Sequence, residues 1–204
     1  LWHSTWAEVG DDVKQLFEFV HLPIPCLDSI DDIVQHLGQL ISKAPGAVVG
    51  FSLGGYLAGR LALAFSPFIQ QLMIVSNSLS ALPQAELAVR SNVINWLKRN
   101  DYAGISTERI LALLHPSSDE DRHVVKCIKM MDAELGQSVV INQLSVSTQR
   151  DDILLSVCNR KNNVTFVLGD SDPLVDLAEL RRANSVAGVA PPNIINDCGH
   201  MLPL

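Results

Sequence analysis

Hydrophobic residues along the chain gather in short runs that are separated by longer amphipathic stretches. Runs of Val, Ile, Leu and Phe without regular polar alternation are typical of strands buried on both faces of a sheet. They predict strands at residues 17–21, 47–51, 71–76, 164–168 and 193–195. Helical stretches fill most of the gaps between these runs. The pattern therefore predicts an α/β fold, a mostly parallel sheet flanked by helices.

Three of the intervening stretches predict helices next to the sheet. Residues 28–42 repeat apolar positions at helical spacing and carry acidic residues in the first turn. Residues 53–65 and 174–186 each follow a predicted strand directly.

Residues 82–163 break the alternation of strand and helix. This stretch predicts consecutive helices at 84–99, 106–114, 119–135 and 138–149. Because it lies between two predicted strands, we expect a core formed by residues 1–81 and 164–204. Residues 82–163 would then form a helical insertion and return segment over one end of the sheet. The insertion is either a cap above an active site or an ordinary helical subdomain, and the two interpretations are compatible.

Composition and charge narrow the classes of function. The 204 residues, 48% of them hydrophobic, suffice for one domain with a sizeable core. A net charge of -7 without a basic patch argues against nucleic-acid binding. No apolar run reaches the roughly 18 residues of a membrane-spanning helix. The cysteines are far apart and have no metal-ligand spacing, so we expect reduced thiols in a cytoplasmic protein. They are Cys26, Cys127, Cys158 and Cys198.

A single serine stands where a predicted strand meets a predicted helix. Ser52 lies in Gly-Phe-Ser-Leu-Gly, a G-x-S-x-G match at residues 50–54. A strand before the motif and a helix after it are the setting of a nucleophile elbow, a sharp turn that exposes the hydroxyl. Residues with a side chain in place of Gly50 and Gly54 would collide across such a turn, and glycine at both positions avoids the collision. The same turn would place the Leu53 N–H where it can stabilise an oxyanion. The alternative is a glycine-rich turn with an incidental serine.

Two later strand ends carry the partners that a nucleophilic serine needs. Asp170 and Asp172 follow the strand at 164–168, and His200 follows the strand at 193–195. The carboxyl ends of parallel strands share one edge of a sheet, where ligands bind. We therefore expect Ser52, an aspartate and His200 to meet there. The other histidines are interpreted as structural or solvated; they are His3, His21, His36, His115 and His123.

From residue 6 to residue 204 the chain resembles the α/β-hydrolase superfamily, in particular a branch of small bacterial hydrolases. The resemblance rests on GFSLGG at the elbow, GDSDP at the acid turn and CGHMLPL at the histidine. MMDAELG, Gln143 and QRDDILL resemble the return segment from cap to core in that branch. It implies a hydrolase in which Ser52 attacks an acyl carbonyl, His200 moves the proton and Asp172 orients the imidazole. Asp170 competes for the acid position, and Asp176 is expected inside the following helix.

Three functions remain open at this point. The first is a serine hydrolase that cleaves a carboxylic ester or related acyl bond of a small molecule. The second is a lyase or carbon–carbon-bond hydrolase on the same scaffold, and the third is a non-catalytic small-molecule binder. Fold and triad do not separate the first two. We expect no cofactor and no metal, and the sequence indicates neither the substrate nor the oligomeric state.

The resemblance also implies that the sequence begins inside the fold. In the family a central strand lies between the strand expected at 17–21 and the elbow strand. No candidate for it occurs in these residues, and the loop after it carries the second oxyanion donor. We therefore expect the functional protein to carry about 20–30 further residues before Leu1, by analogy with the family's layout. A signal peptide there would not be visible in these residues.

Overall fold

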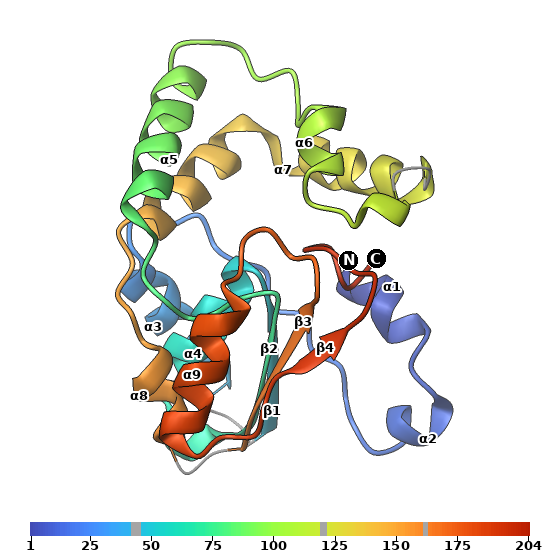
Figure 1. Ribbon diagram of the computed structural model, residues 1–204, viewed down its shortest axis with the longest axis vertical. Helices are drawn as coiled ribbons and strands as arrows, with labels where there is room; N and C mark the ends of the chain where they lie inside the picture. Colours follow the sequence, from blue (N-terminus) through green and yellow to red (C-terminus); the bar gives the residue numbers. More distant parts are fainter. Residues whose placement is uncertain (42–45, 119–121, 161–162) are drawn as a thin grey trace.

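A parallel sheet organises the chain (Figure 1). The computed structural model describes residues 1–41, 46–118, 122–160 and 163–204. Within these residues the sheet has four strands in the order β1-β2-β3-β4, and every neighbouring pair is parallel. The strands are β1 (Gly46–Phe51), β2 (Ile69–Val75), β3 (Asn163–Gly169) and β4 (Asn193–Ile195). They lie within two residues of four of the predicted strands, and the predicted α/β class is confirmed.

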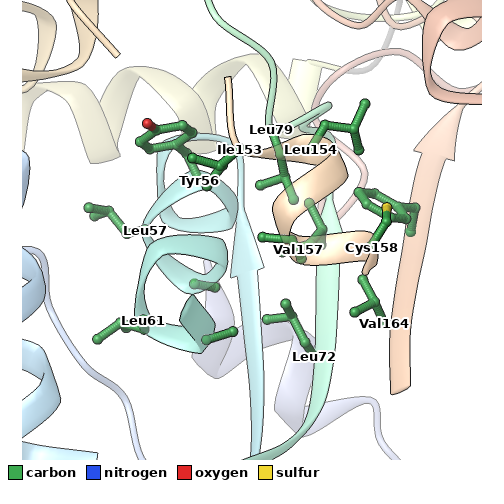
Figure 2. Close-up of a cluster of buried hydrophobic side chains, with 14 of the residues drawn as sticks. Tyr56, Leu57, Leu61, Leu72, Leu79, Ile153, Leu154, Val157, Cys158 and Val164 are labelled. Carbon is green, nitrogen blue, oxygen red and sulfur yellow. The ribbon is translucent and has the colours of Figure 1, made fainter. Parts of the chain in front are cut away.

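Helices cover one face of this sheet. Helix α4 (Leu53–Ala64) packs on β1 and β2, and α3 (Ile30–Ile41) packs on α4. Helix α8 (Leu154–Cys158) packs on α4 and on α9 (Leu177–Ala187). The buried side chains between these elements form the core, part of which is shown in Figure 2. Members of the core include Tyr56, Leu57, Leu61, Leu72, Leu79, Ile153, Leu154, Val157, Cys158 and Val164.

The opposite face of β1 and β2 is open. Leu72 and Ile74 point into the core and are almost fully buried, whereas Met73 between them is 39% exposed. Val49, which pairs with Met73 across the sheet, is 46% exposed. The prediction that these strands are buried on both faces is therefore wrong in the described part of the chain, because the helices that pack on them lie on one side.

The strand predicted at residues 17–21 is also absent from the structure. In the described residues this segment makes no strand pairing, and Phe17 and Val20 are 58% and 64% exposed. Phe19 instead stacks on Trp6 of α1 (Trp2–Ala7), with ring centroids 5.1 Å apart. A hydrophobic run becomes a strand only beside a free strand edge, and the run itself does not show whether one is present. Helix α2 (Asp11–Lys14) precedes this segment.

Helices α5 (Gln84–Leu97), α6 (Thr107–Leu111) and α7 (Arg122–Thr148) lie together at one end of the molecule, apart from the helices on the sheet (Figure 1). Gly136 interrupts α7 with φ 72° and ψ 168°, between the helices predicted at 119–135 and 138–149. Residues 119–121 lie outside the described residues. Helix α6 ends at Leu111 and not at residue 114. Among the described residues, no helix combines the length and apolar character that a membrane span needs.

Shorter elements complete the connections. The 3-10 turns η1 (Ser66–Phe68) and η2 (Pro116–Ser118) follow α4 and α6. Helix α9 begins at Leu177, later than predicted, because Asp176 caps it: its carboxylate accepts a hydrogen bond from the Glu179 N–H at 2.9 Å. The expectation that Asp176 lies inside this helix is wrong.

Candidate active site

The turn from β1 to α4, residues 50–55, is called the elbow below. Ser52 occupies it with φ 51° and ψ -119°, angles that a residue with a side chain seldom adopts. Four hydrogen bonds hold this backbone. Ser52 N–H donates to the Val75 carbonyl at 2.9 Å, and the Ser52 carbonyl accepts from Gly55 N–H and Asn77 Nδ2, both at 2.9 Å, and from Tyr56 N–H at 3.3 Å. Ser52 therefore adopts strained backbone angles, as the serine of a nucleophile elbow does.

Two glycines of the elbow, Gly50 and Gly55, leave little or no room for a side chain. The sequence predicted Gly50 and Gly54. A Cβ at Gly50 would lie 2.2 Å from the Gly54 carbonyl oxygen. A Cβ at Gly54 would meet nothing within 4 Å, so the expected collision at that position is wrong. Gly55 is the second tight position, because its Cβ would lie 3.1 Å from both Asn77 Cβ and the Gly50 carbonyl.

Three of the predicted side chains meet at the carboxyl edge of the sheet. Ser52 Oγ lies 2.9 Å from His200 Nε2, and His200 Nδ1 lies 2.9 Å and 3.0 Å from the two carboxylate oxygens of Asp172. A carboxylate can only accept, so Nδ1–H donates to Asp172 and Nε2 is left to accept the Ser52 hydroxyl proton. The Asp172 side chain is fully buried, and its Oδ1 also accepts from the Leu174 N–H at 2.9 Å.

Asp170, the competitor for this position, has a different set of contacts. It is exposed, and its carboxylate accepts from the N–H groups of Asp197 at 3.1 Å and Cys198 at 3.2 Å. These hydrogen bonds, the one from Asp197 first, lower the pKa of Asp170 below its usual value. Asp170 therefore fastens the loop of residues 196–200, called the histidine loop below, without an observed contact to the imidazole.

The histidine loop also contacts the helical insertion. His200 N–H donates to the Leu113 carbonyl at 2.7 Å, just after α6. A Cβ at Gly199 would lie 2.5 Å from the same carbonyl oxygen. The Leu113 carbonyl, just after the end of α6, thus serves the histidine loop. The His115 side chain approaches Asp197 of the loop at 3.9 Å and bonds to Ser117 Oγ at 2.6 Å.

A pocket of about 180 Å³ opens beside Ser52 and His200. The core contributes the polar run at residues 76–78, directly after β2, and the insertion contributes Arg90 of α5 and Ser147 of α7. Arg150, which follows α7, and Glu86 of α5 also belong to the polar lining. Another, more open pocket of about 500 Å³ lies between α6 and α7 and contains none of the predicted site residues.

Sequence reasoning missed Arg90, Arg150 and the serines and asparagine at 76–78 as site residues. One signal was available, since residues 76–78 directly follow a predicted strand at the edge where ligands bind. Arg150 stands in the QRDDILL segment, where it drew no functional interpretation. Leu53 is the first residue of α4, so its N–H has no acceptor within the helix. No group of three or more potential metal ligands occurs in the described residues.

Comparisons with known proteins agree with this fold. A family model described as "Alpha/beta hydrolase family" matches residues 10–204. The pimeloyl-[acyl-carrier protein] methyl ester esterase of Vibrio atlanticus (strain LGP32) is 28% identical over 216 aligned positions. The matched region covers 98% of this chain and 78% of that protein.

Solved structures are similar as well. A thermophilic esterase from Thermogutta terrifontis with malate bound superposes with a TM-score of 0.73 at 17% identity, covering 92% of this chain and 70% of its own. The enol-lactonase from Burkholderia xenovorans LB400 superposes with a TM-score of 0.65 at 14% identity, covering 88% and 68%. At such identities the likeness concerns the fold alone.

Proposed function

Because the chain belongs to the alpha/beta hydrolase family, we propose that it is a serine hydrolase that cleaves a carboxylic ester or related acyl bond of a small molecule. The observation that carries the proposal is the continuous hydrogen-bonded series from Ser52 Oγ through His200 to Asp172. Relatives named as esterases support the hydrolase class. The Vibrio relative is named for a methyl ester, which makes short methyl esters the first substrates to test.

The proposed reaction uses each contact of the series. Ser52 Oγ attacks the acyl carbonyl while His200 Nε2 takes its proton, and His200 then returns that proton to the leaving alcohol. Water, activated by His200, would hydrolyse the resulting acyl-enzyme. Asp172 keeps the proton of the neutral imidazole on Nδ1 and stabilises the imidazolium.

The developing oxyanion needs donors that do not move during the reaction. We assign one of them to the Leu53 N–H at the N-terminus of α4, where the helix dipole also favours negative charge. The second donor, expected from residues before Leu1, stays a prediction. Residues 82–163 would act as the cap, since Arg90 and Ser147 from this segment line the pocket beside Ser52.

Replacing the nucleophile tests the proposal. Ser52→Ala should lower the turnover of short methyl esters on the order of 10⁶-fold, because the three residues act as a unit. A fluorophosphonate probe should label the wild type and not the variant, and mass spectrometry of the labelled peptide identifies the serine. Ser66→Ala, at an exposed serine in η1, is the matched control and should keep both activity and labelling. Labelling at another serine, or turnover retained in Ser52→Ala, contradicts the assignment.

A further inference from the structure

Arg150 is held firmly at the pocket beside Ser52. Its Nε donates to the Ser80 carbonyl at 2.9 Å, and its guanidinium carbon lies 5.1 Å from the centre of the Tyr56 ring. Its two terminal nitrogens have no acceptor among the residues that the structure describes, and the side chain lines the pocket. A guanidinium fixed on two sides with its outer donors unused is preorganised to bind a planar anion in two parallel hydrogen bonds.

The charges around Arg150 leave the pocket positive on that side. The neighbouring Arg90 is already paired: its Nε donates to Glu86 at 2.8 Å and its Nη1 donates to Ser147 Oγ at 3.0 Å. Burial and the proximity of Arg90 lower the pKa of Arg150 to about 10, which still leaves it charged at neutral pH. Glu86 thus pairs with one arginine, and no carboxylate in the described pocket lining pairs with the other, although the charges of Glu86 and Asp152 act on Arg150 from a distance.

A buried serine lies beside the same pocket. Ser76 is 1% exposed and lines the pocket, and its Oγ has no hydrogen-bond partner in the structure. A buried hydroxyl without a partner is costly unless something satisfies it. The Ser76 Oγ has almost no accessible surface, so a ligand with oxygen atoms in the pocket would meet the Arg150 donors and not this hydroxyl.

We propose that Arg150 binds a free carboxylate on the substrate, so that the preferred substrates are monoesters of short dicarboxylic acids. That the substrate is an ester rests on the proposed function. That it carries a free carboxylate rests on the position of Arg150 in the pocket. A volume of about 180 Å³ is below the roughly 300–1,000 Å³ of pockets for drug-sized ligands, which favours a short acyl chain. Phosphate has the same anionic chemistry, and the test below separates the two.

Matched esters provide the kinetic test. Monomethyl glutarate and methyl pentanoate differ only by a carboxylate in place of a methyl group at the end of the acyl chain. We expect wild type to prefer monomethyl glutarate in kcat/KM. Arg150→Gln should lose about 10- to 100-fold on monomethyl glutarate, the range for a hydrogen bond to a charged group, and less than about threefold on methyl pentanoate. Arg150→Lys should recover part of the preference, because it restores the charge without the fork.

Controls separate this inference from stability and from the proposed function. Arg181→Gln removes an exposed arginine of α9 and should leave the ratio of the two kcat/KM values unchanged. Equal losses on both esters in Arg150→Gln, or a wild type without preference, overturn the inference and leave the hydrolase in place. Failure to label Ser52 with fluorophosphonate contradicts the proposed function instead.

Binding measured without turnover completes the test. Calorimetric titration of glutarate into Ser52→Ala should show binding that is weakened about 10-fold or more when Arg150→Gln is added. Inorganic phosphate should bind more weakly than glutarate. Tighter binding of phosphate, or glutarate binding that does not depend on Arg150, overturns the carboxylate assignment whether or not the protein cleaves esters.

Discussion

Ser52 and His200 lie 2.9 Å apart, yet the elbow that carries the serine and the histidine loop are held in different ways. Mainly backbone atoms fix the elbow, with one side-chain hydrogen bond from Asn77: strand β1 enters it, helix α4 leaves it, and Gly50 lets the two pass closely. Backbone hydrogen bonds such as that from Ser171 N–H to the Cys198 carbonyl also hold the histidine loop, but the loop depends in addition on the Asp170 carboxylate and on the Leu113 carbonyl of the distant insertion.

This difference determines how each half responds to substitution. The elbow is built within a few consecutive residues, so a change there strains the turn itself. The histidine loop depends on contacts from two other parts of the chain, the end of β3 and the helical insertion, so a side-chain contact from one can be removed while the other remains. Side-chain substitutions should therefore give graded effects in the loop, and glycine substitutions should give abrupt ones in the elbow.

Among substitutions of the residues that hold Ser52 and His200 in place, the largest effect is expected on the histidine side, at the buried contact that sets the tautomer. In Asp172→Asn the amide can donate to Nδ1, which places the imidazole proton on Nε2, where it can no longer accept from Ser52. We expect kcat to fall about 10⁴-fold with little change in fold. Ester turnover together with the rate of fluorophosphonate labelling measures the loss. A loss below tenfold shows that another group orients His200.

The next effect tests whether backbone contact governs the elbow. Gly50→Ala puts a Cβ 2.2 Å from the Gly54 carbonyl oxygen, and both atoms belong to regular elements that cannot easily move. We expect a destabilisation of about 1–3 kcal/mol or more, seen as a fall of several degrees in Tm. Gly54→Ala is the matched control, because its Cβ meets nothing within 4 Å. Equal Tm losses in the two variants contradict the packing assigned to the elbow.

The same contrast between local and distant contacts explains which parts of the fold the sequence predicted. Four strands and the elbow were predictable because each signal is local: an apolar run, or a serine between glycines. The run at 17–21 misled, because whether it pairs depends on a strand edge elsewhere. The contact between the Leu113 carbonyl and His200 could not be predicted for a similar reason, because the two residues are far apart along the chain.

Within the candidate site, residue types were easier to predict than contacts. Ser52, His200 and the choice of Asp172 over Asp170 agree with the observed geometry, although their catalytic roles stay proposals. Gly54 was assigned a packing role that Gly55 has. Arg150 was missed because its approach to Ser52 depends on how the helical insertion returns to the core, which has no signature in the spacing of residues.

The smallest effect is expected for Asp170→Asn, the exposed partner of the histidine loop. The variant keeps one oxygen acceptor for the Asp197 and Cys198 N–H groups but loses the charge and the second oxygen. Because His200 keeps its contacts to Asp172 and Leu113, we expect kcat/KM to fall only about two- to tenfold. Asp101→Asn, at an exposed aspartate in the loop after α5, is the control.

The pH dependence of this small effect identifies its cause. The pKa of Asp170 is lowered in the folded protein, so its carboxylate stabilises the fold above the unfolded pKa of about 3.9. That contribution is lost as the pH falls through the lower, folded value. The Tm difference between wild type and Asp170→Asn should therefore be constant near neutral pH and shrink below about pH 4. A difference that stays unchanged at acidic pH would mean that the side chain acts by its shape, and the histidine loop would then resemble the elbow in being held by packing.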